Sequence, residues 1–251
     1  MAAIPIFFRR GSSPMSERFF LSSAACPGRT VLEGDEARHL VRVLRGKVGD
    51  MVRVFDGSGI EWPARVVTIG RDEVTLELGE PTAVAVATTL PLTLAVALPK
   101  GERQKWLIEK LTELGVARLV PLVTLRGVAE ATPAAIERLR RGVLEACKQS
   151  GRNTLMGIGE PRSIAELLRE RPDAARMLVA DPGAPLLEAA ELQPDATAVI
   201  ALVGPEGGFA VEELAVLEAA GVVRVGLGPH ILRVETAAIA LAARLTQAEV
   251  R

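Results

Sequence analysis

The chain has 251 residues, of which 49% are hydrophobic and 24% charged, and its formal net charge is −1. This composition is typical of a globular protein and argues against disorder, and the length suits one large domain or two smaller ones. Two cysteines and two histidines are too few for a disulfide framework or a multi-histidine metal centre, so we expect no bound metal.

Residues 1–16 are expected to form an N-terminal extension. A short apolar patch is followed there by Arg9 and Arg10, which is the reverse of the order in a signal peptide. No apolar run in the chain reaches the roughly 18 residues that a membrane helix needs. We therefore expect a cytoplasmic protein with reduced cysteines and no contact with a membrane.

Residues 17–85 are expected to form a small β-barrel or sandwich. Short strands are predicted over 51–55, 63–69 and 73–78, and turn-forming residues separate them. A short helix is predicted before these strands, with Asp35 as its cap. Arg38, Arg42 and Arg45 are spaced i, i+4 and i+7, which would place them on one helical face, and Lys47 follows. Such a stripe is either a solvated helix face or a surface that contacts phosphates.

Residues 90–251, which follow a predicted linker, alternate between strands and helices, and this order predicts a parallel α/β sheet. The almost continuous apolar run over 92–98 is typical of a strand buried on both faces. Further strands are predicted over 118–123, 177–180, 196–203 and 222–226. Helices are predicted over 102–114, 133–149, 211–220 and 234–249.

Two glycine-rich turns follow consecutive predicted strands. The first, Gly204-Pro205-Glu206-Gly207-Gly208-Phe209, stands between a strand and a helix, where ligands usually bind to a parallel sheet. It is neither a P-loop nor the dinucleotide pattern G-x-G-x-x-G. The second, over 226–237, ends at the start of an apolar helix. Because glycines let the backbone approach a ligand closely, the pair predicts a binding site at one edge of the sheet.

The charges are unevenly distributed along the chain. Residues 99–152 carry 11 Lys and Arg against 6 Asp and Glu, whereas residues 153–251 carry 8 against 14. A basic segment inside a nearly neutral protein indicates either a surface that binds a polyanion or ordinary solvated helix faces. Within it, Arg152 follows a predicted helix end, and Cys147 is interpreted as a buried small apolar residue.

Together these features resemble the 16S ribosomal RNA (uracil-N3)-methyltransferase family, which belongs to the SPOUT methyltransferases. The resemblance covers nearly the whole chain from about Glu17. It is carried by residues 18–21, 39–45, 49–50, 55–57, 110–116 and 149–152, and most specifically by 204–209 and 227–237.

The resemblance implies a fold, an activity and partners. It implies a PUA-like N-terminal β-barrel that holds RNA and a C-terminal SPOUT α/β domain whose chain forms a trefoil knot, an exception to the rule against knotted chains. It also implies a homodimer that binds S-adenosyl-L-methionine in the knot loops and methylates nitrogen 3 of uracil in 16S ribosomal RNA of the small ribosomal subunit, at uridine 1498 in the standard numbering.

The resemblance also assigns residues to the site. Glu206 and Glu235 are the acidic candidates for removal of the N3 proton; the sequence does not decide between them, and a water-mediated route stays open. Arg152 or Arg233 is expected to hold the uracil anion. Backbone and apolar contacts to the cofactor are expected from Leu202, Gly204, Pro205, Gly207, Gly208, Leu227, Gly228, Leu232, Thr236 and Ala237. RNA contacts are expected from Arg38, Arg42, Arg45, Lys47, Lys100, Arg103 and Lys105.

Departures from the family pattern, at His230, Leu125, Met156 and Ala210, and three alternative functions stay open. His230 stands where the family usually has arginine, and Leu125 stands where it often has glutamate. The nearest alternative is a SPOUT enzyme that modifies another RNA atom, such as a tRNA ribose hydroxyl. The others are a non-catalytic RNA-binding factor for ribosome assembly and, less compatible with the barrel-like N-terminal region, a small-molecule α/β enzyme.

Overall fold

The computed structural model describes residues 17–25, 27–83, 90–187 and 196–246. The chain divides into two compact units, residues 1–84 and 85–251, which we call the N-terminal unit and the C-terminal unit. The predicted extension over 1–16, most of the predicted linker and the end of the last predicted helix lie outside the described residues. No helix among the described residues is long and apolar enough to cross a membrane.

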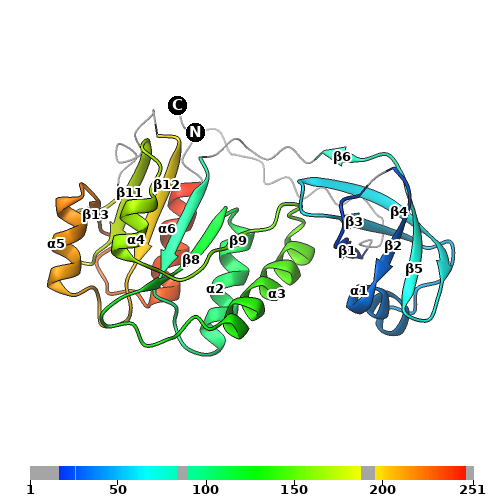
Figure 1. Cartoon of the computed structure of the whole chain (residues 1–251), viewed down its shortest axis with the longest axis horizontal. Coiled ribbons are helices and arrows are strands. Elements are labelled where there is room, and N and C mark those ends of the chain that lie inside the picture. The colour runs from blue at the N-terminus through cyan, green and yellow to red at the C-terminus, as the bar shows by residue number, and fades with distance from the viewer. Residues whose placement is uncertain (1–16, 26, 84–89, 188–195, 247–251) are drawn as a thin grey trace, which may run out of the picture. The chain divides into compact units, whose positions relative to one another are not determined.

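The N-terminal unit is built around one curled sheet (Figure 1). Its strands run in the order β1-β3-β4-β5-β2, with β6 beside β4; β1 is parallel to β3 and the other pairs are antiparallel. A register shift between Val66 and Thr68 interrupts the β4–β5 pairing, and such a bulge bends a strand. The strands are β1 (Arg18–Phe20), β2 (Gly28–Glu33), β3 (Met51–Phe55), β4 (Ile60–Ile69), β5 (Glu73–Leu78) and β6 (Thr82–Ala83).

The predicted arginine stripe lies on a helical segment that differs from the predicted one. Helix α1 (Gly34–Arg38) continues into a π-helical turn, η1 (His39–Val43). Asp35 lies in the first turn of α1 and forms an ion pair with Arg38, whereas the capping position belongs to Glu33. Arg45 follows the helical segment with a positive φ of 56°. The prediction that Asp35 caps a helix carrying all three arginines on one face is therefore wrong, because the helix ends before Arg45.

The C-terminal unit is an α/β sandwich with a parallel sheet, as the sequence predicted, and among the described residues this sheet has seven strands, two more than were predicted. The strand order is β10-β8-β7-β12-β11-β13, with β9 also paired to β8. The strands are β7 (Leu92–Val96), β8 (Arg118–Val123), β9 (Gly157–Ile158), β10 (Arg162–Ser163), β11 (Ala175–Ala180), β12 (Ala198–Val203) and β13 (Val223–Val225). The helices are α2 (Glu102–Glu113), α3 (Pro133–Ser150), α4 (Ile164–Glu170), α5 (Val211–Ala219) and α6 (Val234–Thr246).

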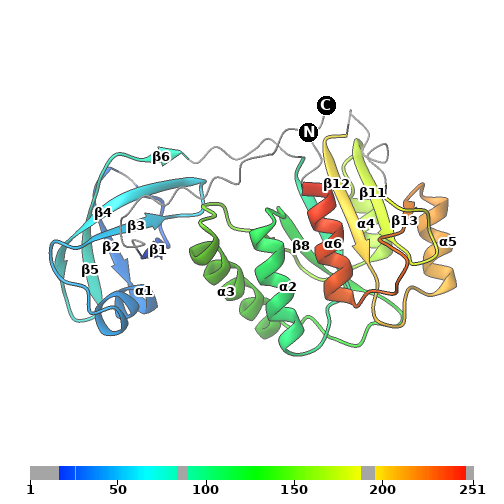
Figure 2. The ribbon, with the colours of Figure 1, turned by 180° about the vertical axis from the view of Figure 1, so that it is seen from behind.

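Helices cover both faces of this sheet. Helices α3, α2 and α6 lie side by side on one face (Figure 2), while α4 and α5 cover the other. The central strands β7 and β12 are therefore buried on both faces, which explains their continuous apolar sequences. Apolar side chains of the sheet pack against Ile164 and Leu167 of α4 and Leu217 of α5.

The chain crosses itself closely after β13. The N–H of Gly226 donates to the carbonyl of Pro185 at 2.6 Å, and the N–H of Leu187 donates to the carbonyl of Gly226 at 3.0 Å. A Cβ at position 226 would lie 2.3 Å from the carbonyl oxygen of Ala184, so only glycine fits there. Residues 188–195, which follow this crossing segment, lie outside the described residues, and the trefoil knot that the resemblance implies stays a prediction.

Candidate functional site

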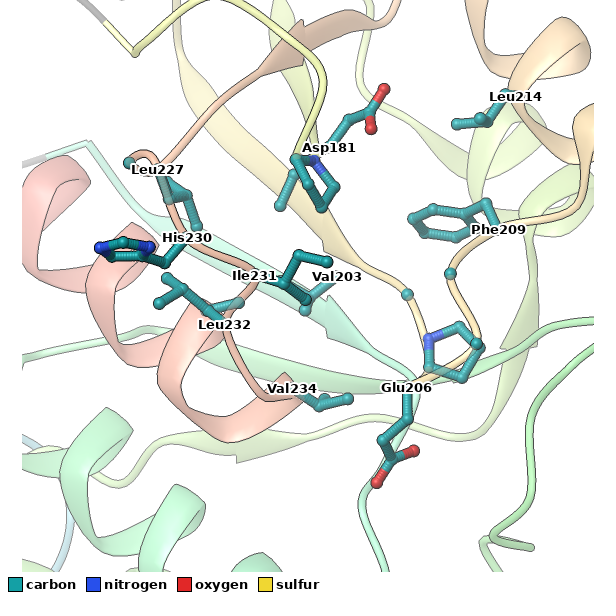
Figure 3. Close-up of a pocket in the computed structure, with 18 residues that line it drawn as sticks. Asp181, Val203, Glu206, Phe209, Leu214, Leu227, His230, Ile231, Leu232 and Val234 are labelled. Carbon is teal, nitrogen blue, oxygen red and sulfur yellow. The ribbon is translucent and has the colours of Figure 1, made fainter.

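A cavity of about 310 Å³ lies at the carboxyl ends of β11, β12 and β13. Its walls come from the two predicted glycine-rich turns, from residues 180–182 after β11, and from the first turn of α6. Figure 3 shows apolar side chains around this cavity, among them Val203, Phe209, Leu227, Ile231 and Leu232. The cavity therefore offers apolar surface together with backbone groups of two tight turns.

The first turn is shaped by its glycines and by Arg126. Gly208 has a φ of 68°, and a Cβ on Gly204 would lie 2.9 Å from the ring of Phe209. The Arg126 guanidinium donates from Nη1 to the carbonyl of Gly207 at 2.9 Å, and its contact to the carbonyl of Phe209 is 3.5 Å. The loop after β8 therefore fixes the direction of the peptide groups beside the cavity.

Helix α5 begins at this turn without a side-chain cap. Ala210 occupies the capping position, and its N–H donates to Oε2 of Glu213 at 2.8 Å. Oε1 of the same carboxylate accepts the N–H of Leu125 at 2.9 Å. Glu213 therefore ties the start of α5 to the loop that carries Arg126, although Ala210 itself offers no side-chain oxygen.

The second turn follows the chain crossing at Gly226. Gly228 has a φ of 149°. Ile231 is 85% exposed although it lines the cavity, and His230 lies on the same lining. This turn consequently presents an apolar side chain and an imidazole at the cavity mouth.

Most residues expected to contact a cofactor line this cavity. Leu202 does not, because it is fully buried within β12, and exposed Thr236 lies outside the lining. The eight that do are Gly204, Pro205, Gly207, Gly208, Leu227, Gly228, Leu232 and Ala237. The structure thus brings both turns together, and contact with a cofactor stays a prediction.

The sequence analysis missed the third wall, which contains Ala180, Asp181 and Pro182. The side chain of Asp181 accepts the Arg224 guanidinium at 2.6 Å and the N–H of Gly183 at 3.2 Å. A polar turn directly after the apolar run of β11 was the available signal, because parallel strands end at a common edge of the sheet.

The two acidic candidates lie near the same guanidinium nitrogen. Nη1 of Arg103, in the first turn of α2, is 2.9 Å from Oε1 of Glu206 and 3.8 Å from Oε2 of Glu235. Figure 3 shows the Glu206 carboxylate pointing away from the apolar wall of the cavity. Arg103, expected to contact RNA, therefore joins the glycine-rich turn to α6.

Arg152 lies elsewhere in the unit. Its Nη1 donates to the carbonyl of Thr112 at 2.9 Å, at the end of α2, and its Nε donates to Oγ1 of Thr154 at 3.2 Å. Burial lowers the pKa of the Arg152 guanidinium, and the Cys147 thiol partly opposes this shift. Because Thr112 ends the helix that begins beside the cavity, Arg152 lies toward the opposite edge of the sheet within its own chain. It joins the ends of α2 and α3.

The remaining basic candidates are exposed. Arg233 lies beside the second turn but outside the cavity lining. Lys100 and Lys105 flank the start of α2 in the C-terminal unit, whereas Arg38, Arg42, Arg45 and Lys47 belong to the N-terminal unit. Cys147 is fully buried as predicted, and its thiol is 3.6 Å from the carbonyl of Thr154. The described residues contain no group of acidic, cysteine or histidine side chains suited to a metal.

Comparison with known proteins identifies the family to which the chain belongs. Residues 87–246 match the family model of the RNA methyltransferase domain, and residues 32–79 match that of the RNA methyltransferase PUA domain. Ribosomal RNA small subunit methyltransferase E of Rickettsia conorii is 33% identical over 236 residues, which cover 91% of this chain and 94% of that protein. The chain belongs to the ribosomal RNA small subunit methyltransferase E family.

Other members of the family support the assignment over most of the chain. The methyltransferase E of Synechocystis sp. is 35% identical over 206 residues, which cover 80% of this chain and 67% of that protein. A crystal structure of the methyltransferase E of Neisseria gonorrhoeae, bound to S-adenosyl methionine, has a TM-score of 0.84 and 29% identity, and the alignment covers 91% of this chain and 96% of that chain. The predicted fold class, a SPOUT α/β domain with a PUA-like N-terminal sheet, is confirmed.

Proposed function

We propose that this protein transfers a methyl group from S-adenosyl-L-methionine to nitrogen 3 of a uracil in 16S ribosomal RNA, and that the target is uridine 1498. The observation that carries the proposal is the cavity between two glycine-rich turns in a chain of the ribosomal RNA small subunit methyltransferase E family. We further propose that the protein acts in the cytoplasm, where it meets the small ribosomal subunit.

The residues of the cavity fit S-adenosyl-L-methionine. Its apolar side chains suit an adenine ring, and the turns at 204–209 and 226–233 supply backbone donors and acceptors for polar groups. A side chain at Gly204 would collide with the ring of Phe209, which lines the cavity. When bound, the cofactor supplies an electrophilic methyl group, so the protein has to position the base and stabilise its anion.

Nitrogen 3 lies on the Watson–Crick edge of uracil, so the base must be unpaired when it reacts. The protein therefore needs a surface that holds RNA by its backbone while one base enters the site. The chain has no tyrosine and 3% aromatic residues, which favours contacts to phosphate and sugar over extended base stacking.

Nucleoside analysis of 16S ribosomal RNA tests the proposal in cells. RNA from cells that lack the protein should lose 3-methyluridine at position 1498, and expression of the protein should restore it. If tRNA from these cells lost a ribose methyl group and 16S ribosomal RNA kept its 3-methyluridine, the alternative of a tRNA ribose methyltransferase would be supported. An unchanged set of modifications in both RNAs would favour a non-catalytic assembly factor.

The N-terminal unit is expected to contribute to RNA affinity through Arg42 and Arg45. Both side chains are exposed, and neither forms an ion pair within the described part of the chain, whereas Arg38 is paired with Asp35. Replacing Arg42 and Arg45 with alanine should flatten the slope of log affinity against log salt by about 1.4 to 1.8, because each phosphate contact contributes about 0.7 to 0.9.

Fluorescence anisotropy with labelled RNA over a salt series measures this slope. Arg65→Ala is the matched control, since Arg65 is an exposed arginine of the same unit that is paired with Glu77. A slope equal to that of the wild type in the double variant would assign Arg42 and Arg45 to a solvated surface.

We also propose that the protein is a homodimer that pairs through α2 and α6. Trp106 of α2 is 44% exposed, and Ile239, Ala240 and Ala243 of α6 are only partly buried within the chain. An exposed tryptophan beside a helix of small residues suits the centre of a protein interface. The two helices lie next to each other (Figure 2).

Light scattering at micromolar concentration tests this pairing. The wild type should show about twice the 26.6 kDa mass of one chain, and Trp106→Lys should shift the protein toward the single-chain mass. Val216→Lys, which changes an exposed apolar residue on α5, should leave the mass of the wild type unchanged. A single-chain mass for the wild type would refute the homodimer.

A further inference from the structure

Arg103 lies where three elements of the proposed catalytic site meet. It projects from the first turn of α2, and its Nη1 lies 2.9 Å from Glu206 in the glycine-rich turn and 3.8 Å from Glu235 in the first turn of α6. Glu206 lines the cavity, and Glu235 stands between the lining residues Val234 and Ala237. The guanidinium is therefore the cation that the fold places beside both acidic candidates.

The two carboxylates differ in burial. The Glu235 side chain is 6% exposed, and its Oε2 accepts no hydrogen bond from the described residues. A buried carboxylate is costly without a compensating charge, so the attraction between Glu235 and Arg103 persists whatever else binds. The Glu206 side chain is 39% exposed and can be solvated when its ion pair with Arg103 opens. Glu235 is thus the fixed partner of Arg103, and Glu206 is the exchangeable one.

We propose that Arg103 is a catalytic residue that binds the uracil anion, that Glu206 accepts the N3 proton, and that Glu235 positions Arg103. This assignment rests on the proposed function and specifies how the same site performs it. It replaces Arg152 and Arg233 as candidates for the cation. Arg152 is bound to the carbonyl of Thr112. Arg233, like Arg103, lies outside the cavity lining, but within the described part of the chain it forms no ion pair with either acidic candidate, whereas Arg103 pairs with both.

Charge and atoms balance within this arrangement. The proton leaves N3 for the Glu206 carboxylate, which becomes neutral, while the uracil takes up the negative charge. Arg103 can then exchange its strong ion pair with Glu206 for one with the uracil edge, and the net charge of the group stays the same. The N3 electron pair forms the new bond to the methyl carbon, and the electrons of the broken carbon–sulfur bond stay on sulfur. Glu206 finally releases its proton to water.

Single-turnover methyl transfer to a small-subunit RNA fragment that contains the target uridine gives the first test. Arg103→Met should lower the transfer rate by about 10² to 10³-fold, the usual effect of removing one donor that stabilises a developing anion. Arg103→Lys should lower the transfer rate less, because the positive charge remains although the planar guanidinium with its paired N–H donors is lost. Glu235→Gln should lower the rate without changing the KM for RNA. Arg169→Met, which removes an ion-paired arginine on α4, should react like the wild type.

A binding experiment without cofactor separates this role from a structural one. The probe is the same RNA fragment with 5-fluorouridine at the target position, whose N3 proton is more acidic than that of uridine. Wild-type protein should bind this probe more tightly as the pH rises and the base ionises, and Arg103→Met should lose that dependence. The double variant Arg103→Met/Glu235→Gln, which removes the buried Glu235 carboxylate together with its cationic partner, should be as well folded as the wild type and still lack the dependence.

The outcomes are distinguishable. If the RNA contact that the sequence analysis expected of Arg103 were a contact with a phosphate alone, its loss would reduce the salt slope of RNA binding by about 0.7 to 0.9 and leave the transfer rate unchanged. Equal rates for the wild type and Arg103→Met, or retained pH dependence with the fluorinated probe, would overturn this assignment alone. Absence of N3 methylation by the wild type would overturn the proposed function and this assignment with it.

Discussion

Gly226→Ala is expected to destabilise the C-terminal unit by about 1 to 3 kcal/mol, the usual cost of an overpacked interior. The new Cβ would lie 2.3 Å from the carbonyl oxygen of Ala184 and 3.1 Å from that of Pro185. Both neighbours are backbone atoms of the crossing segment, so no flexible side chain can move aside. The segments around Gly226 and Ala184 would have to move apart at this crossing. The second glycine-rich turn, which begins at Gly226, would move as well.

Titration calorimetry measures the affinity for the cofactor, and denaturant unfolding measures the free energy of unfolding. Affinity for S-adenosyl-L-methionine should fall at least tenfold, about 1.4 kcal/mol, together with the loss of stability. Gly183→Ala is the matched control in the same crossing segment, because a Cβ there would meet only the Asp181 carboxylate, at 3.9 Å. Normal stability and normal affinity in Gly226→Ala would show that the crossing does not shape the site.

Ala242→Glu is expected to be more damaging, with a loss of at least about 3 kcal/mol of stability, because it buries a charge without a partner. Ala242 is fully buried on the side of α6 that packs against its own sheet and α2. The neighbouring Ala243 is only partly buried, so Ala243→Glu should leave the fold intact.

Circular dichroism and light scattering of both variants separate folding from assembly. Ala242→Glu should be unfolded or strongly destabilised at any concentration. Ala243→Glu should be folded and, if α6 contributes to the proposed dimer, should have the mass of one chain. A folded, stable Ala242→Glu protein would contradict the packing of α6 described here.

The order of strands and helices could be predicted because each element carries its own signal. The apolar run of β7 and the alternating pattern of α/β elements lead to a parallel sheet without knowledge of tertiary contacts. The two glycine-rich turns could be placed together for the same reason, since parallel strands end at one edge. The side of α6 that faces the sheet could not be predicted, because that helix is apolar nearly all round and Ala238 and Ala242 look like Ala240 and Ala243.

The charges of the site were harder to predict than its backbone. Arg103 is one of 11 basic residues between positions 99 and 152, and only the folded chain brings it beside Glu206 and Glu235. Arg152 looked equally suitable, but its guanidinium joins the ends of two helices. In the N-terminal unit, helical spacing misplaced Arg45 because a π-helical turn and a positive φ follow α1. Long charged side chains take their roles from tertiary contacts that local pattern does not specify.

Transfer of an isotope-labelled methyl group from S-adenosyl-L-methionine by the purified protein tests the central claim most directly. Small ribosomal subunits and protein-free 16S ribosomal RNA from cells that lack the modification serve as substrates, and mass spectrometry of the digested RNA locates the label. We predict one labelled methyl group on nitrogen 3 of uridine 1498, formed by the wild type and lost in Gly226→Ala. Label on a ribose oxygen or on another base, or no transfer to either substrate, would contradict the account.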